Sequence, residues 1–278
     1  MTGCTTDTNL YLPFLTHSIR LAYLYDFKNY PRQHFGAGTR HKIRLKKENE
    51  KWYVFRETYS DPMEENPEMI PVTSVKTYMD KLSEANREPS VQVTPVQSNG
   101  RYNRKRAVIY ANKYAGSAWG AGNRNQYNDR YRDYTDEGGD CTNFASQVIG
   151  DPIEGGGLQM LPNWHFSPQS GGTVSWIRTD SFKDFLLYGG YGQLIASGYF
   201  EDVTKPTPSF PKGAIHELKP GDLIGYEMKG DLDHFSIVVG TDDHGYLLVN
   251  SYTWDRYRMP WDIGWDNKTK FWLIQIKD

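Results

Sequence analysis

The sequence predicts an α+β protein, because two kinds of pattern occupy different parts of the chain. Between residues 107 and 188, apolar side chains recur at the i, i+3, i+4 and i+7 spacing of amphipathic helices. Between residues 222 and 276, short runs rich in apolar and β-branched residues are separated by turn residues, as in strands. Helices followed by strands favour an α+β fold over the alternation of an α/β fold.

Residues 1–100 are expected to form a smaller N-terminal α+β module. A helix is predicted over residues 18–27. Residues 41–45 and 52–59 flank a polar, charged turn, and the alternation of apolar and polar side chains there predicts a β-hairpin. The Pro-rich end of this module is the predicted linker to the next domain.

Residues 101–278 are expected to form the larger domain. Each of its predicted elements is bounded by glycine, proline or polar turn residues. The predicted helices cover residues 107–114, 144–149 and 181–188, and the predicted strands cover residues 222–226, 235–241, 246–251 and 271–276.

Composition narrows the class of protein. Apolar residues make up 38 % of the chain and charged residues 24 %, which is typical of a globular protein. No apolar run approaches eighteen residues, so we expect no transmembrane helix. A net charge of −2 gives no sign of nucleic-acid binding. The 14 % of aromatic residues predict a Tyr-rich core or, alternatively, a groove of rings with Trp119 and Trp164 among its walls.

The segment Gly138-Gly139-Asp140-Cys141-Thr142-Asn143-Phe144 is the first candidate for chemistry. The glycines permit a sharp turn, Asp140 suits a helix N-cap, and Cys141 then falls in the first helical turn. The helix dipole there favours a thiolate, which is the nucleophile for acyl transfer. The alternative is a small buried cysteine with no chemical role. With only Cys4 as a second cysteine, a disulfide framework is excluded, although one Cys4–Cys141 pair is not.

His234 is the candidate general base, because it stands at the start of a predicted strand, after the turn Pro220-Gly221-Asp222 and the strand that follows it. The chain then returns through a hairpin that brings residues near 250–255 beside it. An acceptor that orients the imidazole is expected in this stretch. Asn250 is the first choice, since its amide oxygen holds the ring without a buried charge, while Tyr252 and Asp255 remain alternatives.

These residues also carry a resemblance. The stretch from Tyr102 to Ala111, the motif Gly-Gly-Asp-Cys-Thr-Asn-Phe-Ala-Ser-Gln, Asp233-His234 and Tyr252-Thr253-Trp254-Asp255-Arg256 are similar to the bacterial putative amidase domain family over about residues 101–277. That family resembles papain-like cysteine hydrolases of the NlpC and CHAP cell-wall type. The resemblance implies a papain-like α+β fold, with the Cys helix packed on an antiparallel sheet, Cys141 as nucleophile and His234 as base. It also implies peptidoglycan or another peptide amide as substrate, with Asp140, Trp119, Trp164 and Tyr252 as candidate substrate contacts.

Two features depart from the family pattern. The family often has His-Thr where this chain has Tyr252-Thr253, so an inherited role of position 252 does not follow. Residues 1–100 lie outside the domain, and their hairpin resembles the end of an NTF2-like domain. The rival to the hydrolase is a non-catalytic cell-wall or glycan-binding protein on the same fold.

The remaining expectations concern cofactors, partners and location. No His-Glu-x-x-His or P-loop motif is present, so neither a metal nor a cofactor is expected. We expect a monomer that acts outside the cell or at its surface. The polar start Thr2-Gly3-Cys4 matches the end of a lipobox, so anchoring through a lipid on Cys4 is a further hypothesis.

Overall fold

The computed structural model describes residues 10–25, 31–63, 102–122, 127–137 and 139–278. Its strands are β1 Leu10–Tyr11, β2 Phe14–Tyr23, β3 Gln33–Glu48, β4 Lys51–Ser60, β5 Phe166–Ser167, β6 Gly171–Gly172, β7 Gly192–Gly198, β8 Leu223–Met228, β9 Asp231–Thr241, β10 Leu247–Ser251, β11 Asp255–Pro260 and β12 Lys270–Ile276. Its helices are α2 Arg104–Lys113, α3 Cys141–Gly150, α4 Val174–Ile177, α5 Thr179–Tyr188 and α6 Phe200–Thr204, with 3₁₀ turns at η2 Thr135–Glu137 and η3 Ala214–Glu217.

One antiparallel sheet organises the described residues. Eight of its ten strands follow the order β1-β3-β11-β10-β9-β8-β12-β7, and the other two, β2 and β4, pair with β3. Every pairing in it is antiparallel. The predicted α+β class with an antiparallel sheet is therefore confirmed, whereas the papain-like topology stays a prediction.

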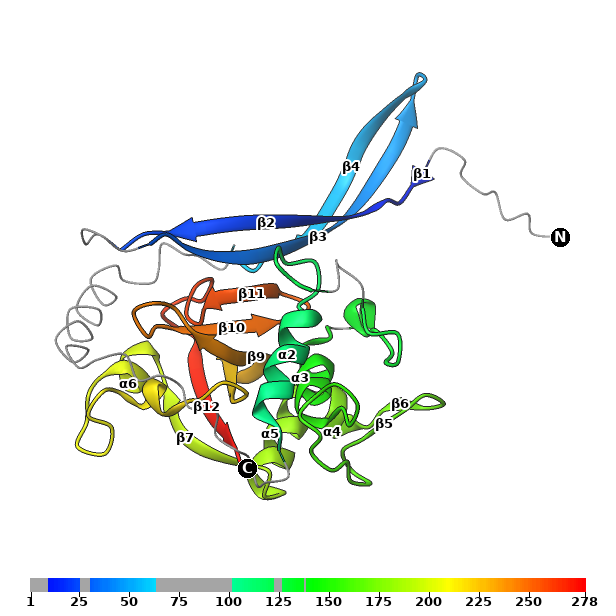
Figure 1. The fold of residues 1–278 in the computed structure, drawn as a ribbon. Coiled ribbons are helices and arrows are strands. Elements are labelled where there is room, and N and C mark those ends of the chain that lie inside the picture. Colours follow the sequence, from blue (N-terminus) through cyan, green and yellow to red (C-terminus); the bar gives the residue numbers. More distant parts are fainter. Residues whose placement is uncertain (1–9, 26–30, 64–101, 123–126, 138) are drawn as a thin grey trace.

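The two faces of this sheet bury different clusters, because alternate residues of a strand point to opposite sides. On β9, Phe235 and Ile237 pack in one cluster with side chains of α2, α3 and α5. Val238 packs in a second cluster with Val203 of α6 and with Trp261. Figure 1 shows α2 and α3 on one side of the central strands and α6 on the other. Helix α3, which begins at Cys141, therefore packs against β9 on the face of the first cluster.

The N-terminal segment joins the same sheet. Strand β3 pairs with β11, with Ala37 opposite Arg256. A Cβ on Gly36 would lie 1.9 Å from the Trp119 carbonyl oxygen, so β3 can lie this close to the 117–119 loop only with a glycine there. The predicted domain boundary near residue 100 falls outside the described residues and stays a prediction.

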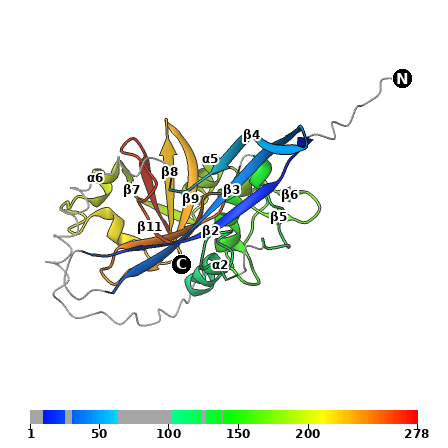
Figure 2. The ribbon, with the colours of Figure 1, turned by 90° about the horizontal axis from the view of Figure 1, so that it is seen from above.

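The helix predicted over residues 18–27 is wrong in its described part, which continues strand β2 to Tyr23. From Ile19 to Tyr25, alternate side chains are more buried, and β2 pairs with β3 along its whole length (Figure 2). The period-2 pattern Ile19, Leu21, Tyr23 was already visible in the sequence, and it outweighs helix propensity once a partner strand supplies the hydrogen bonds.

The other predicted helices and strands correspond to observed elements. The hairpin is confirmed as β3 and β4, and its turn at Asn49-Glu50 has positive φ at both residues, as in a type I′ turn. The three predicted helices correspond to α2, α3 and α5, and the four predicted strands to β8, β9, β10 and β12. Strands β7 and β11 were not predicted.

Candidate active site

Helix α3 begins at Cys141, as the motif predicts. Gly139 adopts φ 115°, a left-handed conformation that favours glycine and turns the chain sharply into the helix. Asp140 occupies the N-cap position, but its carboxylate makes no cap hydrogen bond. Instead, its backbone N–H donates to Thr253 Oγ1 at 2.5 Å. The start of the helix is therefore held by the 252–255 turn rather than by an Asp side-chain cap.

The Asp140 carboxylate holds the loop that precedes it. It accepts hydrogen bonds from Tyr134 N at 2.8 Å, from Tyr127 Oη at 2.7 Å and from Asn143 Nδ2 at 2.9 Å. The residue is 0 % exposed, and this burial raises the pKa of the carboxyl to about 7 against the opposing effect of the three donors. With no exposed surface, Asp140 does not fit its predicted role as a substrate contact.

The remaining polar residues of the motif fix bulky side chains around α3. Asn143 Oδ1 accepts from the Trp176 indole at 2.7 Å, and Ser146 Oγ accepts from the Trp164 indole at 3.0 Å. Because buried polar groups are costly when unpaired, each bond specifies one rotamer in the core. Trp164 is 0 % exposed and packed against other rings, so it belongs to the core and is not a groove wall.

The Cys141 sulfur lies against the main chain that carries His234. Its Sγ donates to the Asp233 carbonyl oxygen at 3.8 Å, and the backbone N–H of Phe235 donates toward it. The residue is 8 % exposed, and burial raises the pKa of its thiol. The expected thiolate is therefore not supported in this arrangement, because burial raises the pKa of the thiol.

The His234 ring is enclosed by aromatic side chains. Its centroid lies 5.0 Å from that of Trp254, 5.7 Å from Trp265 and 5.8 Å from Tyr226. Burial, followed by the positive charge of Arg256, lowers the pKa of His234 well below its ordinary value. The buried Nε2 atom has no hydrogen-bond partner, and among the described residues no hydrogen bond joins Sγ to the ring. Both groups are therefore neutral at neutral pH. The ring lies among side chains of the second cluster, and the dyad itself stays a prediction.

Asn250 does not orient this imidazole. Its Nδ2 donates to the Ala111 carbonyl oxygen at 3.0 Å and to Asn112 Oδ1 at 2.9 Å, and its Oδ1 accepts from Arg258 N at 2.6 Å. The side chain ties the end of α2 to β11. The register explains this, because Asn250 pairs with Ile237 and not with a residue next to His234.

The two alternatives to Asn250 are also occupied elsewhere. Tyr252 is 3 % exposed, and its ring packs against Tyr127 and Phe144, which also leaves it no surface for the predicted substrate contact. Asp255 is buried and paired with Arg40. Of the predicted substrate contacts, Trp119 keeps an exposed ring, with 38 % of the residue accessible and the Arg20 guanidinium 4.6 Å from the ring centroid.

Arg40 is a positioning residue that the sequence did not reveal. Its Nε and Nη2 donate to Asp255 Oδ2 at 3.2 and 2.9 Å, and its guanidinium lies 4.8 Å from the centroid of the Tyr252 ring. Asp255 in turn accepts from Thr253 N at 3.0 Å. A continuous path therefore runs from β3 through the 252–255 turn to the start of α3. Arg40 and Asp255 lie 215 positions apart, so no local pattern could have linked them.

The described residues contain no group of three or more His, Cys, Asp or Glu side chains placed to hold a metal ion. No helix formed by them is both long and apolar enough to cross a membrane.

Comparison with known proteins identifies the family to which the larger part of the chain is similar. The family model described as a putative amidase domain matches residues 101–274. The chain is also similar to an uncharacterized protein, YhbB, of Bacillus subtilis (strain 168), with 30 % identity over 171 residues. That match covers 58 % of this chain and 44 % of the relative, so the chain spans less than half of the relative's length. No solved structure matches the chain.

Proposed function

The chain belongs to the putative amidase domain family, and from that membership and the position of Cys141 we propose that it is a cysteine-dependent amide hydrolase. Membership indicates an amidase-type hydrolase. The more specific proposal, that the Cys141 thiol is the nucleophile, rests on one observation. Sγ of this first residue of α3 contacts the main chain on both sides of His234. A thiol at a helix N-terminus next to a histidine suits acyl transfer.

Because the thiol pKa is raised and the imidazole pKa is lowered, we propose that the proton moves from Cys141 to His234 only when the substrate is attacked. At neutral pH both groups are uncharged, so His234 acts as a general base when substrate arrives. The imidazole takes the thiol proton as Sγ attacks the amide carbon, and it returns that proton to the departing amine. The same imidazole then deprotonates water, which attacks the thioester to give the carboxylic acid, and it returns that proton to the departing Cys141 thiolate. The backbone N–H of Cys141, at the start of α3, is the donor that we assign to the oxyanion.

Within this proposal, the fold is papain-like and the substrate is a peptide amide of the bacterial cell wall. Since wall amides lie outside the membrane, the enzyme is exported. Attachment through a lipid on Cys4 is compatible with this, but Cys4 lies outside the described residues. The exposed Trp119 ring is the substrate contact that the geometry still supports.

The test is digestion of purified peptidoglycan, with the products analysed by mass spectrometry. The native protein should release new amine and carboxyl ends at one type of amide bond. Cys141→Ala should release none while unfolding at a similar temperature, because alanine suits the first turn of a helix. His234→Gln should lose most of the turnover, and Cys4→Ala serves as the matched cysteine control.

Two outcomes would overturn the proposal. Cleavage by Cys141→Ala at the native rate would exclude the thiol as nucleophile. Tight binding of the native protein to peptidoglycan, without new chain ends, would establish the rival function of a non-catalytic wall-binding protein.

A further inference from the structure

The N-terminal strands carry a large exposed apolar surface. We call β1, β2, β4 and the paired part of β3 the N-terminal ribbon, and Figure 1 shows its β3–β4 end extending beyond the body of the molecule. On β4, Trp52 is 48 % exposed, Val54 63 % and Phe55 66 %. Trp52 and Tyr53, which is 52 % exposed, are neighbours in the regular part of β4 and face opposite sides, so both faces of the β4 end are bare. So many adjacent exposed apolar side chains mark an interaction surface.

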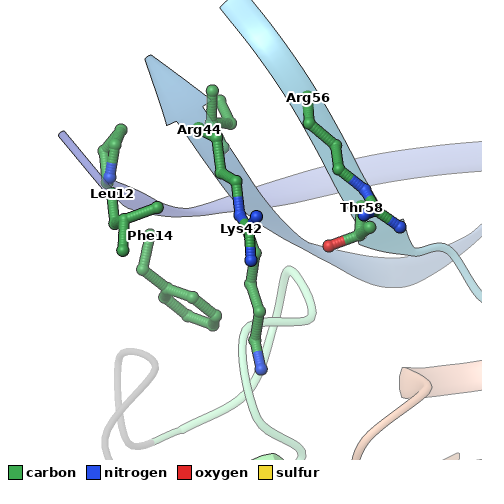
Figure 3. Close-up of a pocket in the computed structure, with 8 residues that line it drawn as sticks. Leu12, Phe14, Lys42, Arg44, Arg56 and Thr58 are labelled. Atoms are coloured by element: carbon green, nitrogen blue, oxygen red, sulfur yellow. The ribbon is translucent and has the colours of Figure 1, made fainter. Parts of the chain in front are cut away.

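A cationic pocket lies on the same ribbon. It has a volume of about 430 Å³ and is lined by Leu12, Pro13, Phe14, Lys42, Ile43, Arg44, Arg56 and Thr58 (Figure 3). Arg44 and Arg56 are directly opposite each other on β3 and β4. Like charges in this position destabilise a sheet, and neither guanidinium forms an ion pair with a described carboxylate. The pocket therefore has the chemistry of a site for an anionic group.

We infer that the N-terminal ribbon binds the surface of an anionic phospholipid membrane, with a lipid phosphate between Arg44 and Arg56. The exposed rings of Phe14 and Tyr53, which the strand register places on the same face as these arginines, then lie among the headgroups. A phospholipid surface is the partner that matches both the positive charge and the exposed rings of the ribbon. A soluble anion would neutralise the arginines and leave the rings in water. A second copy of the chain would cover the rings but bring two more arginines to the same surface. A phospholipid surface supplies phosphate for the cations and an interfacial layer that tryptophan and tyrosine prefer.

The inference is independent of the proposed hydrolase, because none of the residues that line the pocket belongs to the candidate active site. Its test is co-sedimentation with vesicles of phosphatidylcholine alone or with phosphatidylglycerol added. The native protein should bind the anionic vesicles, and added salt should weaken the binding. Each cation near such a surface contributes about fivefold, so Arg44→Gln with Arg56→Gln should weaken binding by about thirtyfold.

Controls separate charge, rings and folding. Lys205→Gln with Lys212→Gln removes two exposed cations from outside the ribbon and should bind like the native protein. Phe14→Ser with Tyr53→Ser removes two exposed rings from the face of the arginines and should weaken binding without lowering the unfolding temperature. The arginine variant should unfold at the same or a higher temperature, because it relieves a repulsion.

Three results would overturn the inference. Equal binding to neutral and anionic vesicles would remove the role of the cations. Binding of soluble polyphosphate through Arg44 and Arg56, with no vesicle binding, would identify a soluble anion as the ligand. A native dimer that becomes monomeric on Phe14→Ser with Tyr53→Ser, again with no vesicle binding, would show that the ribbon is an interface between copies.

Discussion

Replacing Arg40 with methionine tests whether the N-terminal segment supports the candidate active site. Methionine keeps a similar length and apolar stem but removes the charge. The side chain of Asp255 is 0 % exposed and that of Arg40 13 %, so the substitution leaves a buried carboxylate without its counter-charge. Such a loss typically costs about 3–5 kcal/mol.

The other hydrogen bonds of Asp255 narrow the range of this expected loss of stability. Asp255 keeps hydrogen bonds from Ser117 N at 2.8 Å, Ser117 Oγ at 2.6 Å and Thr253 N at 3.0 Å, which favours the lower end. The lost stacking of the guanidinium on Tyr252 adds about 0.5–1 kcal/mol. We expect the free energy of unfolding, measured by urea titration, to fall by about 3–4 kcal/mol.

Two comparisons make the reasoning refutable. Arg20→Met removes an exposed guanidinium that stacks on Trp119, and it should cost less than about 1 kcal/mol. Adding Asp255→Asn to Arg40→Met should recover part of the loss, because the buried charge disappears. A loss below about 1 kcal/mol for Arg40→Met would refute the buried-pair reasoning. An unchanged turnover in a folded Arg40→Met protein would refute the path from β3 to Cys141.

Three further predictions concern the site. Since burial raises the pKa of Cys141, iodoacetamide should alkylate it more slowly than free cysteine at neutral pH and faster as pH rises; rapid reaction at acidic pH would contradict this. The pKa of Asp140 is about 7 when folded, so its stabilising effect is complete below about pH 4 and is lost as pH rises to 7. Asp140→Asn should reduce the fall of the unfolding free energy between about pH 4 and pH 7, and an unchanged fall would exclude Asp140 as its source. Asn250→Ala should lower the unfolding free energy by about 1–3 kcal/mol and leave the pKa of His234, followed by NMR, unchanged; a shifted pKa would restore its orienting role.

The candidate site shows where sequence reasoning stops. The position of Cys141 at the start of a helix follows from Gly139, because a left-handed turn is a local property of the chain. The ionisation of Cys141 does not follow, because it depends on burial by residues far along the chain. For the same reason, Trp164 and Tyr252 could be identified as aromatic residues but not as core residues.

The sequence by itself determined the elements that rest on local patterns. Hydrophobic periodicity identified α2, α3 and α5, and alternation with turn residues identified the β3–β4 hairpin and four strands of the sheet. It also carried the motif by which the family is recognised. Tertiary structure alone decided that β2 pairs with β3, that Asn250 ties α2 to β11, and that Arg40 reaches Asp255. These outcomes depend on pairing partners and desolvation supplied by distant parts of the chain, and no local window of sequence contains them.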